Sequence, residues 1–145
     1  IGVTFSSAPY TVSQVEILPL TSTLSATISY NMKMDMTVIR QGNKWSMKIP
    51  TSYSREAISG GVIFVGVTQD SNTFEGALAL TDTNDMIVGT ATTTFQSGEG
   101  SFPATAKFEG RISTDGRSIT GVLSVTSELI TQSVPVVLNM QSPGL

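Results

Sequence analysis

A regular alternation of apolar and polar residues runs through residues 24–38. Successive side chains of a strand point to opposite faces, so the alternation predicts a strand with one buried and one hydrated face. Fifteen residues exceed the usual strand length of about 5–6, so we expect the strand either to bend or to break near Asn31. The apolar positions are Leu24, Ala26, Ile28, Tyr30, Met32, Met34, Met36 and Val38.

A turn and a second alternating segment follow. Residues 40–43 contain Gly42 and Asn43, which both tolerate positive φ. Over residues 44–49 the odd positions are apolar again, and the two segments together predict a β-hairpin. Residues 50–61 show no alternation, and we expect either a loop or a single helical turn there.

Further strands are predicted along the rest of the chain, separated by polar or glycine-containing turns that include residues 69–72 and 82–85. Pro135 predicts that the last strand lies at a sheet edge, because proline cannot donate to a ladder. The predicted strands cover residues 62–67, 74–81, 86–95, 104–112, 119–125 and 134–140.

This pattern predicts an all-β fold, an antiparallel meander of roughly nine to eleven strands. Glycines within strands, such as Gly89 and Gly121, favour a curved barrel over a sandwich. Residues 1–20 contain Pro9 and Pro19 and alternate poorly, so we interpret them as an N-terminal arm or a first strand. Residues 21–145 are expected to form a single all-β domain.

The composition restricts the partners. Only 13% of the 145 residues are charged, the net charge is −3, and the eight Lys and Arg residues are scattered along the chain. This distribution argues against nucleic-acid binding. The low charge and the many Ser and Thr residues favour an exported protein, either secreted or located at the cell surface or in the periplasm. No apolar stretch is long enough to predict a transmembrane segment.

The chain lacks the residue types on which much enzyme chemistry depends. It has no Cys and no His, which excludes a thiol nucleophile, a Ser-His-Asp triad and imidazole or thiolate metal sites. Glu75 and Glu109 are the candidates for a paired-carboxylate glycosidase, but both alternate with apolar residues and are expected to face solvent. We therefore expect no catalytic residue, no metal and no cofactor.

The candidate binding residues are sulfur-containing and aromatic. Met is flexible and polarisable, which suits adaptable apolar surfaces. In a barrel these side chains would either line a cavity for an apolar small molecule or pack as ordinary core. The candidate residues are Met32, Met34, Met36, Trp45 and Met47.

Two functions are compatible with these features. The first is a non-catalytic binding or protein-interaction module whose partner is an apolar small molecule or a protein, including another copy of the chain. The alternative is a structural subunit of an extracellular assembly or larger complex, which would use its N-terminal arm or an edge strand for strand addition.

Overall fold

The structure is a computed structural model and describes residues 2–59, 62–83, 85–97 and 100–141. Strands and turns make up this part of the chain, and no helix capable of crossing a membrane is found in it. The strands are β1 (Gly2–Ser7), β2 (Tyr10–Pro19), β3 (Ser25–Met34), β4 (Thr37–Gln41), β5 (Lys44–Ser59), β6 (Val62–Leu80), β7 (Met86–Ser97), β8 (Gly100–Ile112), β9 (Ser118–Ser127) and β10 (Thr131–Met140).

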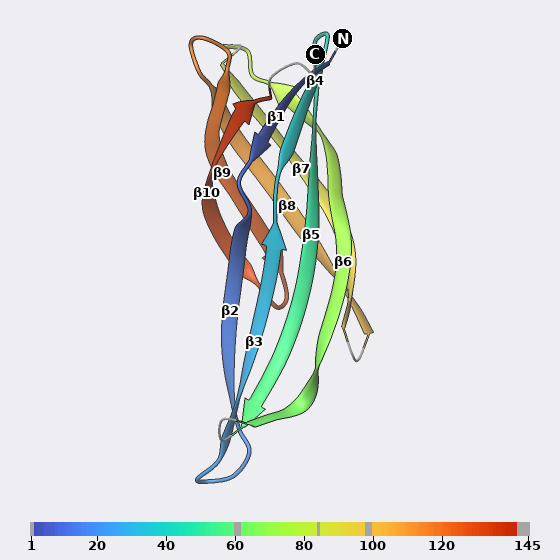
Figure 1. Ribbon diagram of the computed structural model, residues 1–145, viewed down its shortest axis with the longest axis vertical. Coiled ribbons are helices and arrows are strands. Elements are labelled where there is room, and N and C mark those ends of the chain that lie inside the picture. The colour runs from blue at the N-terminus through green and yellow to red at the C-terminus, as the bar shows by residue number, and fades with distance from the viewer. Residues whose placement is uncertain (1, 60–61, 84, 98–99, 142–145) are drawn as a thin grey trace.

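The sheet closes on itself as an eight-stranded antiparallel barrel, which confirms the predicted fold class (Figure 1). Starting from β5, the ring runs through β4, β1, β10, β9, β8 and β7 to β6, which pairs with β5 again. β2 and β3 lie outside this ring. A barrel of eight strands has an interior just wide enough for side chains to fill.

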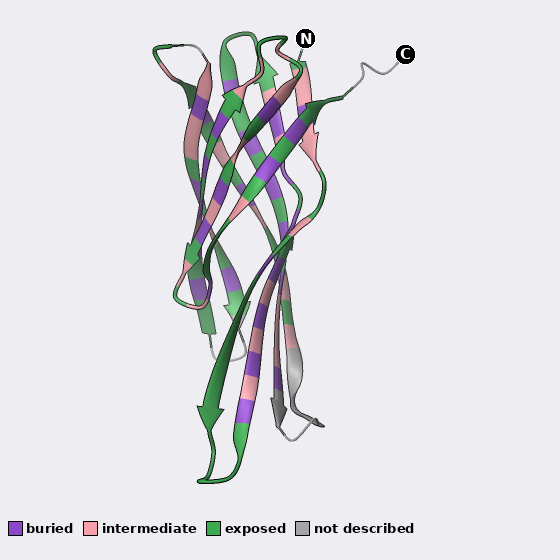
Figure 2. Cartoon of the chain, turned by 90° about the vertical axis from the view of Figure 1, so that its left-hand side faces the viewer, coloured by how far each residue is buried: buried purple, intermediate pink, exposed green. Residues whose placement is uncertain are grey.

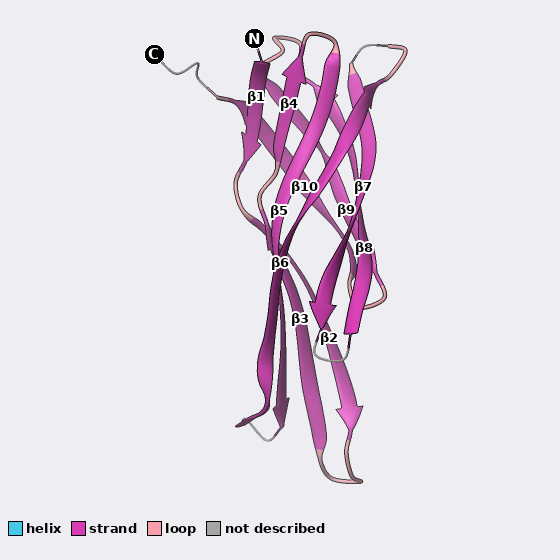
Figure 3. Ribbon diagram, turned by 90° about the vertical axis from the view of Figure 1, so that its right-hand side faces the viewer, coloured by secondary structure: helices cyan, strands magenta, loops and turns pink. Residues whose placement is uncertain are grey.

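β5 and β6 continue beyond the barrel. Residues 44–48 of β5 pair with β4 along the barrel, and residues 51–59 pair with β3, which in turn pairs with β2. We call β2, β3 and residues 51–59 and 62–72 the arm. Figure 3 shows these strands extending past the ends of β7 and β8. The sequence predicted an N-terminal arm or a first strand for residues 1–20. This segment supplies two strands, β1 in the barrel and β2 in the arm defined here.

Two interruptions of the strands lie side by side where the arm leaves the barrel. β1 and β2 are separated at Pro9, which has no N–H to offer a ladder, and β3 and β4 are separated at Asp35 and Met36. The N–H of Ser7 donates to the C=O of Met36 at 3.0 Å, and the N–H of Met36 donates to Ser7 Oγ at 2.9 Å. The long strand therefore breaks at this junction and not near Asn31.

The sequence expectation for residues 50–61 is wrong in the part that the structure describes. β5 runs without interruption to Ser59, held between β3 and β6. Its register with β6 shifts between Arg55 and Ala57. The extra residues lie on β6, while β5 stays in register with β3. Thr51, Tyr53 and Ala57 are all buried, so the two faces of β5 still alternate. The sequence does not show this alternation, because a polar residue, Thr51, occupies one of the buried positions.

The polar turn expected at residues 69–72 is also wrong, because β6 passes through it. Two of its polar side chains bond the backbone of β7. Asn72 Nδ2 donates to the C=O of Thr94 at 2.8 Å, and Asp70 Oδ2 accepts from the N–H of Gln96 at 2.7 Å. These bonds continue the contact between β6 and β7 beyond the short ladder of residues 79–80 and 87–88.

Aromatic side chains occupy both ends of the barrel interior. At the end where β1 begins and β10 ends, the rings of Phe5 and Trp45 stack with centroids 6.0 Å apart. At the end facing the arm, four buried rings have neighbouring centroids 5.0 to 6.0 Å apart, a spacing typical of favourable aromatic pairs. These four are Tyr53, Phe74, Phe95 and Phe102.

Two strand glycines permit unusually close approach of neighbouring backbones. A Cβ atom on Gly121 would lie 2.1 Å from the carbonyl oxygen of Glu109, and one on Gly89 would lie 2.4 Å from that of Ala77. Real Cβ atoms do not tolerate such distances, and the obstructing atoms belong to backbone. The tight contacts of β9 with β8 and of β7 with β6 therefore require glycine.

We expect Gly121→Ala to lower the free energy of unfolding by about 1–3 kcal/mol or more, because the methyl group must push β8 and β9 apart. Urea unfolding followed by the fluorescence of Trp45, the single tryptophan, measures this change. Gly2→Ala is the control, since its added Cβ would meet its nearest neighbour at 3.4 Å. Equal stability of the two variants would contradict the assignment.

Candidate functional site

The five candidate binding residues all point into the protein. Met32 and Met34 lie on β3, Met36 lies at the junction with β4, and Trp45 and Met47 lie on β5. Between 0% and 7% of each side chain is exposed. The alternation therefore identified the correct face of these strands, and the five residues belong to one contiguous core cluster.

These residues form a row that begins at Trp45, in the upper aromatic end of the barrel, and ends at Met34 and Met32 on β3 of the arm. Met47 is opposite Val38 on β4, Met34 is opposite Thr51, and Met32 is opposite Tyr53 of the lower aromatic group. Side chains fill the space on either side of the row. The burial favours core packing, and the use of this row for an apolar ligand stays a prediction.

The upper end of the barrel has a hollow beside Trp45. Its volume is about 340 Å³, and Arg40, Leu80 and Ile112 also line it. The guanidinium carbon of Arg40 lies 5.7 Å from the centroid of the Trp45 ring, a cation–π contact. Arg40 is the one charged residue among those lining the hollow, so the hollow offers an apolar wall and one cation but no acid–base pair.

A more polar hollow lies where the arm diverges from the loop between β9 and β10. It measures about 300 Å³, and Tyr30, Arg55 and Glu128 contribute to its lining. Tyr30 Oη donates to Glu16 Oε2 at 3.1 Å. Burial raises the pKa of the Tyr30 hydroxyl, and the bond to Glu16 raises it further. A neutral tyrosine here acts as a hydrogen-bond donor that positions β2 against β3.

The two candidate carboxylates form ion pairs on the barrel surface. Glu75 lies 3.7 Å from Lys48, and Glu109 lies 3.2 Å from Lys107. More than half of each side chain is exposed. Such pairs contribute little to stability, and this setting matches the solvated strand charges that the alternation predicted.

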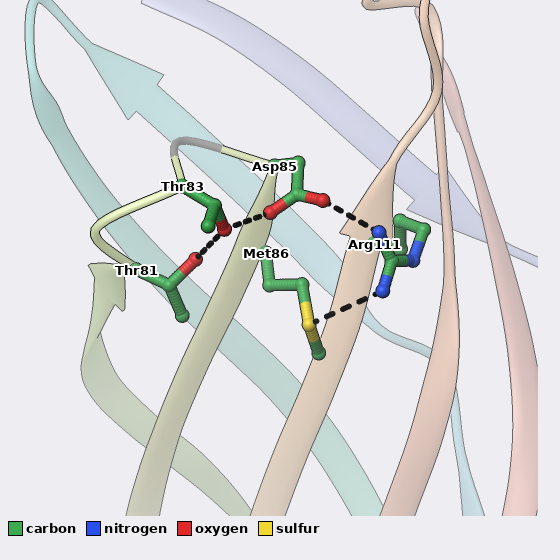
Figure 4. A network of polar contacts seen from close by, with 5 residues as sticks. All are labelled: Thr81, Thr83, Asp85, Met86 and Arg111. Carbon is green, nitrogen blue, oxygen red and sulfur yellow. Dashed lines mark hydrogen bonds and ion pairs between the residues drawn. The ribbon is translucent and has the colours of Figure 1, made fainter.

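Figure 4 shows a polar network at the turn between β6 and β7. Thr83 Oγ1 and the guanidinium of Arg111 both donate to the carboxylate of Asp85. These donors hold the pKa of Asp85 below its usual range, with the Thr83 hydrogen bond contributing most. Asp85 is thus committed to the turn, and the described residues contain no cluster of three or more acidic residues placed to hold a metal ion.

The edge of β2 has two different environments. Over its first part, side chains connect β2 to β10 although no ladder joins the two strands. Past residue 14 no bond between β2 and β10 is found among the described residues. The connecting bonds run from Ser13 N–H to Gln132 Oε1 (2.8 Å), from Thr131 N–H to Gln14 Oε1 (3.2 Å) and from Val137 N–H to Tyr10 Oη (3.1 Å).

We call this contact between β2 and β10 the seam, and Pro135 lies on the β10 side of it. The ladder of β10 with β1 covers residues 138–140, whereas Pro135 pairs with Val122 of β9 on the other side. Because Thr131 and Val137 direct their N–H groups toward β2, the alternating backbone places the nitrogen of Pro135 on the same side. The missing donor therefore faces the seam, where it removes no ladder bond. The prediction that the last strand lies at a sheet edge is wrong, because β10 pairs with both β9 and β1 within the closed ring.

The far half of β2 exposes large apolar side chains. Val15 is 59% exposed and Ile17 is 67% exposed. In Figure 2 the lower part of the protruding strand is coloured as exposed down to the terminal turn. Five of the nine large exposed apolar residues in the described chain lie in this strand or its turn, namely Val15, Ile17, Leu18, Leu20 and Leu24.

No family model, curated protein or solved structure matches this chain. Of the features described above, the β2 edge combines exposed apolar side chains with an unfilled strand position. The five predicted core-facing residues have neither property.

We expect Met36→Ala to lower the free energy of unfolding by about 2–5 kcal/mol, because it removes a buried side chain that the core cannot replace. Met36→Leu keeps most of the volume and should cost less than about 1.5 kcal/mol. Urea unfolding monitored by Trp45 fluorescence compares the two. If Met36 instead lined an open ligand cavity, the alanine variant would be nearly as stable as the wild type.

We expect stability to decrease as the pH falls below about 4, where the unfolded chain begins to bind protons. Asp115 contributes with Asp85, since Ser113 Oγ donates to its carboxylate at 2.6 Å and lowers its pKa. Both folded-state pKa values are lowered, so the stabilisation is present above the unfolded pKa and is lost as the pH falls through the folded pKa.

Thermal unfolding at pH 7 and pH 3 measures this loss. Asp85→Asn and Asp115→Asn should each reduce the difference in melting temperature between the two pH values. Thr83→Val tests the stated cause, because it removes the main donor and leaves the Asp85 carboxylate in place. An unchanged pH dependence in all three variants would contradict this explanation.

Proposed function

We propose that this protein is a non-catalytic interaction module that binds a protein partner by strand addition at the free edge of β2. The observation that carries the proposal is the exposure of Val15 and Ile17 on a strand that, among the described residues, has a neighbour on one side alone at this level. The alternative assignment as a subunit of an assembly uses the same surface. The low charge of the chain favours an extracellular or cell-surface setting.

The backbone of β2 presents hydrogen-bonding groups along this edge. In an antiparallel pair, alternate residues direct both backbone groups toward the neighbouring strand. Leu20 N–H donates to the C=O of Leu24, so the even residues face β3, whereas Ser13 N–H points toward β10. By this alternation Val15 and Ile17 direct their N–H and C=O groups away from β3. An added strand would satisfy these groups, as in β-augmentation.

The side chains along the edge do not protect it from pairing. Exposed edges are commonly blunted by charged residues, lysine above all, or by proline. Residues 11–25 contain a single charged residue, Glu16, and no Lys or Arg. The Glu16 carboxylate lies on the inner face, where it accepts a hydrogen bond from Tyr30, and Pro19 lies at the end of the strand, beyond Val15 and Ile17. The outer face of this edge is therefore apolar at Val15 and Ile17.

The buried methionine row supports this choice over an apolar ligand. A ligand in the barrel would have to displace core side chains such as Met47 and Met36, which are 2% and 1% exposed. Close-packed interiors resist such displacement. The β2 edge needs no rearrangement of this kind, because its groups are already accessible.

We expect Ile17→Lys to abolish partner binding, because it places a charge in the strand-addition site. Native mass spectrometry of protein purified without refolding should show the wild type with a bound chain and the variant as a monomer of 15.3 kDa. Val122→Lys is the matched control, since Val122 is 48% exposed but lies on β9, between β8 and β10. A wild-type monomer, or a partner retained by Ile17→Lys, would reject the proposal.

A further inference from the structure

Building on the proposed function, we propose that the partner strand is β2 of a second copy of this chain, paired antiparallel about a two-fold axis at Ile17. The two arms would then form one continuous sheet. An antiparallel pair of identical strands is isologous, so each copy supplies the same surface that it binds. The chain itself therefore supplies the complementary strand edge, and no second kind of protein is required.

The open backbone groups of β2 are self-complementary in this register. Ile17 of each copy faces Ile17 of the other, and the two residues exchange N–H···O=C bonds as a hydrogen-bonded pair. Val15 faces Pro19, so the N–H of Val15 donates to the C=O of Pro19. Pro19 has no N–H to give in return, which makes it the natural end of the ladder. The outward-facing residues identified above are thus the ones used.

Charge and existing bonds distinguish this register from its neighbours. An axis at Glu16 would place Glu16 opposite Glu16, and like charges directly across a pair are destabilising. An axis at Val15 would place Ser13 opposite Ile17, but the N–H of Ser13 already donates to Gln132 at 2.8 Å. The axis at Ile17 sets Glu16 against Leu18 and leaves the seam with β10 intact.

The side chains of the two copies also match across this interface. Val12 is fully buried and points into the protein, so by alternation Val15 and Ile17 lie on the opposite, outer face of the arm. A two-fold axis perpendicular to the sheet brings outer face beside outer face. Val15 and Ile17 from both copies then form one apolar strip, and cross-strand contacts of β-branched residues stabilise such a pair.

The shape of the molecule leaves room for the second copy. The arm extends past the hairpin of β7 and β8 (Figure 3). Because the paired strands run in opposite directions and the axis lies near the arm's tip, the two barrels lie at opposite ends of the joined sheet. In this arrangement we expect the two barrels to lie apart.

Cysteine pairs test both the partner and the register, because the natural chain contains no Cys. Opposed residues of a non-hydrogen-bonded pair have Cα atoms about 4.5 Å apart, within the range of a disulfide. We expect an equimolar mixture of Glu16→Cys and Leu18→Cys to give a covalent dimer on mild oxidation, and either variant alone to give far less. A mixture of Val122→Cys and Val137→Cys is the control for random oxidation.

Sedimentation of the unmodified protein supplies the second measurement. We expect a concentration-dependent dimer whose dissociation constant rises at least about tenfold in Ile17→Lys. A monomer at every soluble concentration, together with no disulfide from the Glu16→Cys and Leu18→Cys mixture, would overturn the pairing with a second copy. A disulfide formed instead by Gln14→Cys with Glu16→Cys would overturn the stated register.

The two proposals fail differently. If native mass spectrometry shows a bound chain of another mass, which Ile17→Lys loses, strand addition at β2 stands and the second copy is rejected. If the bound partner is retained by Ile17→Lys, the use of the β2 edge is itself rejected.

Discussion

The long ladder between β5 and β6 is the constraint on which the architecture depends. The two strands contain 16 and 19 residues and stay paired from Trp45 with Leu78 to Ser59 with Val62. At about 3.3 Å per residue they span roughly 50–60 Å, whereas the ten residues of β10 span about 33 Å. A hairpin of this length cannot be covered by the barrel alone.

The far end of this hairpin therefore needs its own neighbours. β5 pairs with β4 up to Lys48 and with β3 from Thr51 onward. β2 pairs with the other edge of β3. No strand of the described barrel reaches the next position, because β10 begins its ladder with β9 at Thr131, close to the level of Gln14. The exposed edge of β2 follows from strand length, and its apolar composition is the additional feature that suggests a use.

The seams of the barrel show how a sheet tolerates this divergence. No ladder joins β2 and β10, and the side-chain amide oxygens of Gln14 and Gln132 accept hydrogen bonds from backbone N–H groups across the gap. Asp70 and Asn72 serve the same purpose between β6 and β7. All four bonds are exposed to solvent. These polar side chains keep neighbouring strands connected where the ladder bonds between them are missing.

The alternation in the sequence was sufficient for the fold class and for the inward face of the long Met-containing strand. Side-chain period is a local property, and residues 26–34 follow it closely. Two features were beyond its reach. A polar residue, Thr51, occupies a buried position of β5 and hides the period of this strand in the sequence. Asp70 and Asn72 resemble turn residues, but they bond the backbone of β7, more than twenty positions away. In both cases the side chain's setting depends on neighbours that are distant in the sequence.

The candidate site was partly visible for the same reason. Pro9 and Pro19 marked residues 1–20 as unusual, and Val15 and Ile17 could be assigned to one face by their spacing. Which strand lies beside them could not be read from that spacing. The buried methionines illustrate the opposite case, since their alternation located them correctly but did not distinguish a packed interior from a hollow one.

Isologous pairing would also explain why this chain can have an exposed apolar strand edge without aggregating through it. A free edge can recruit strand after strand and lead to aggregation. Pairing of β2 with β2 occupies that edge on both copies at once, so the same contact cannot extend beyond two chains. Pro19 limits the ladder at one end and the Ser13–Gln132 bond limits it at the other. The edge is thereby restricted to a short segment that one partner strand fills completely.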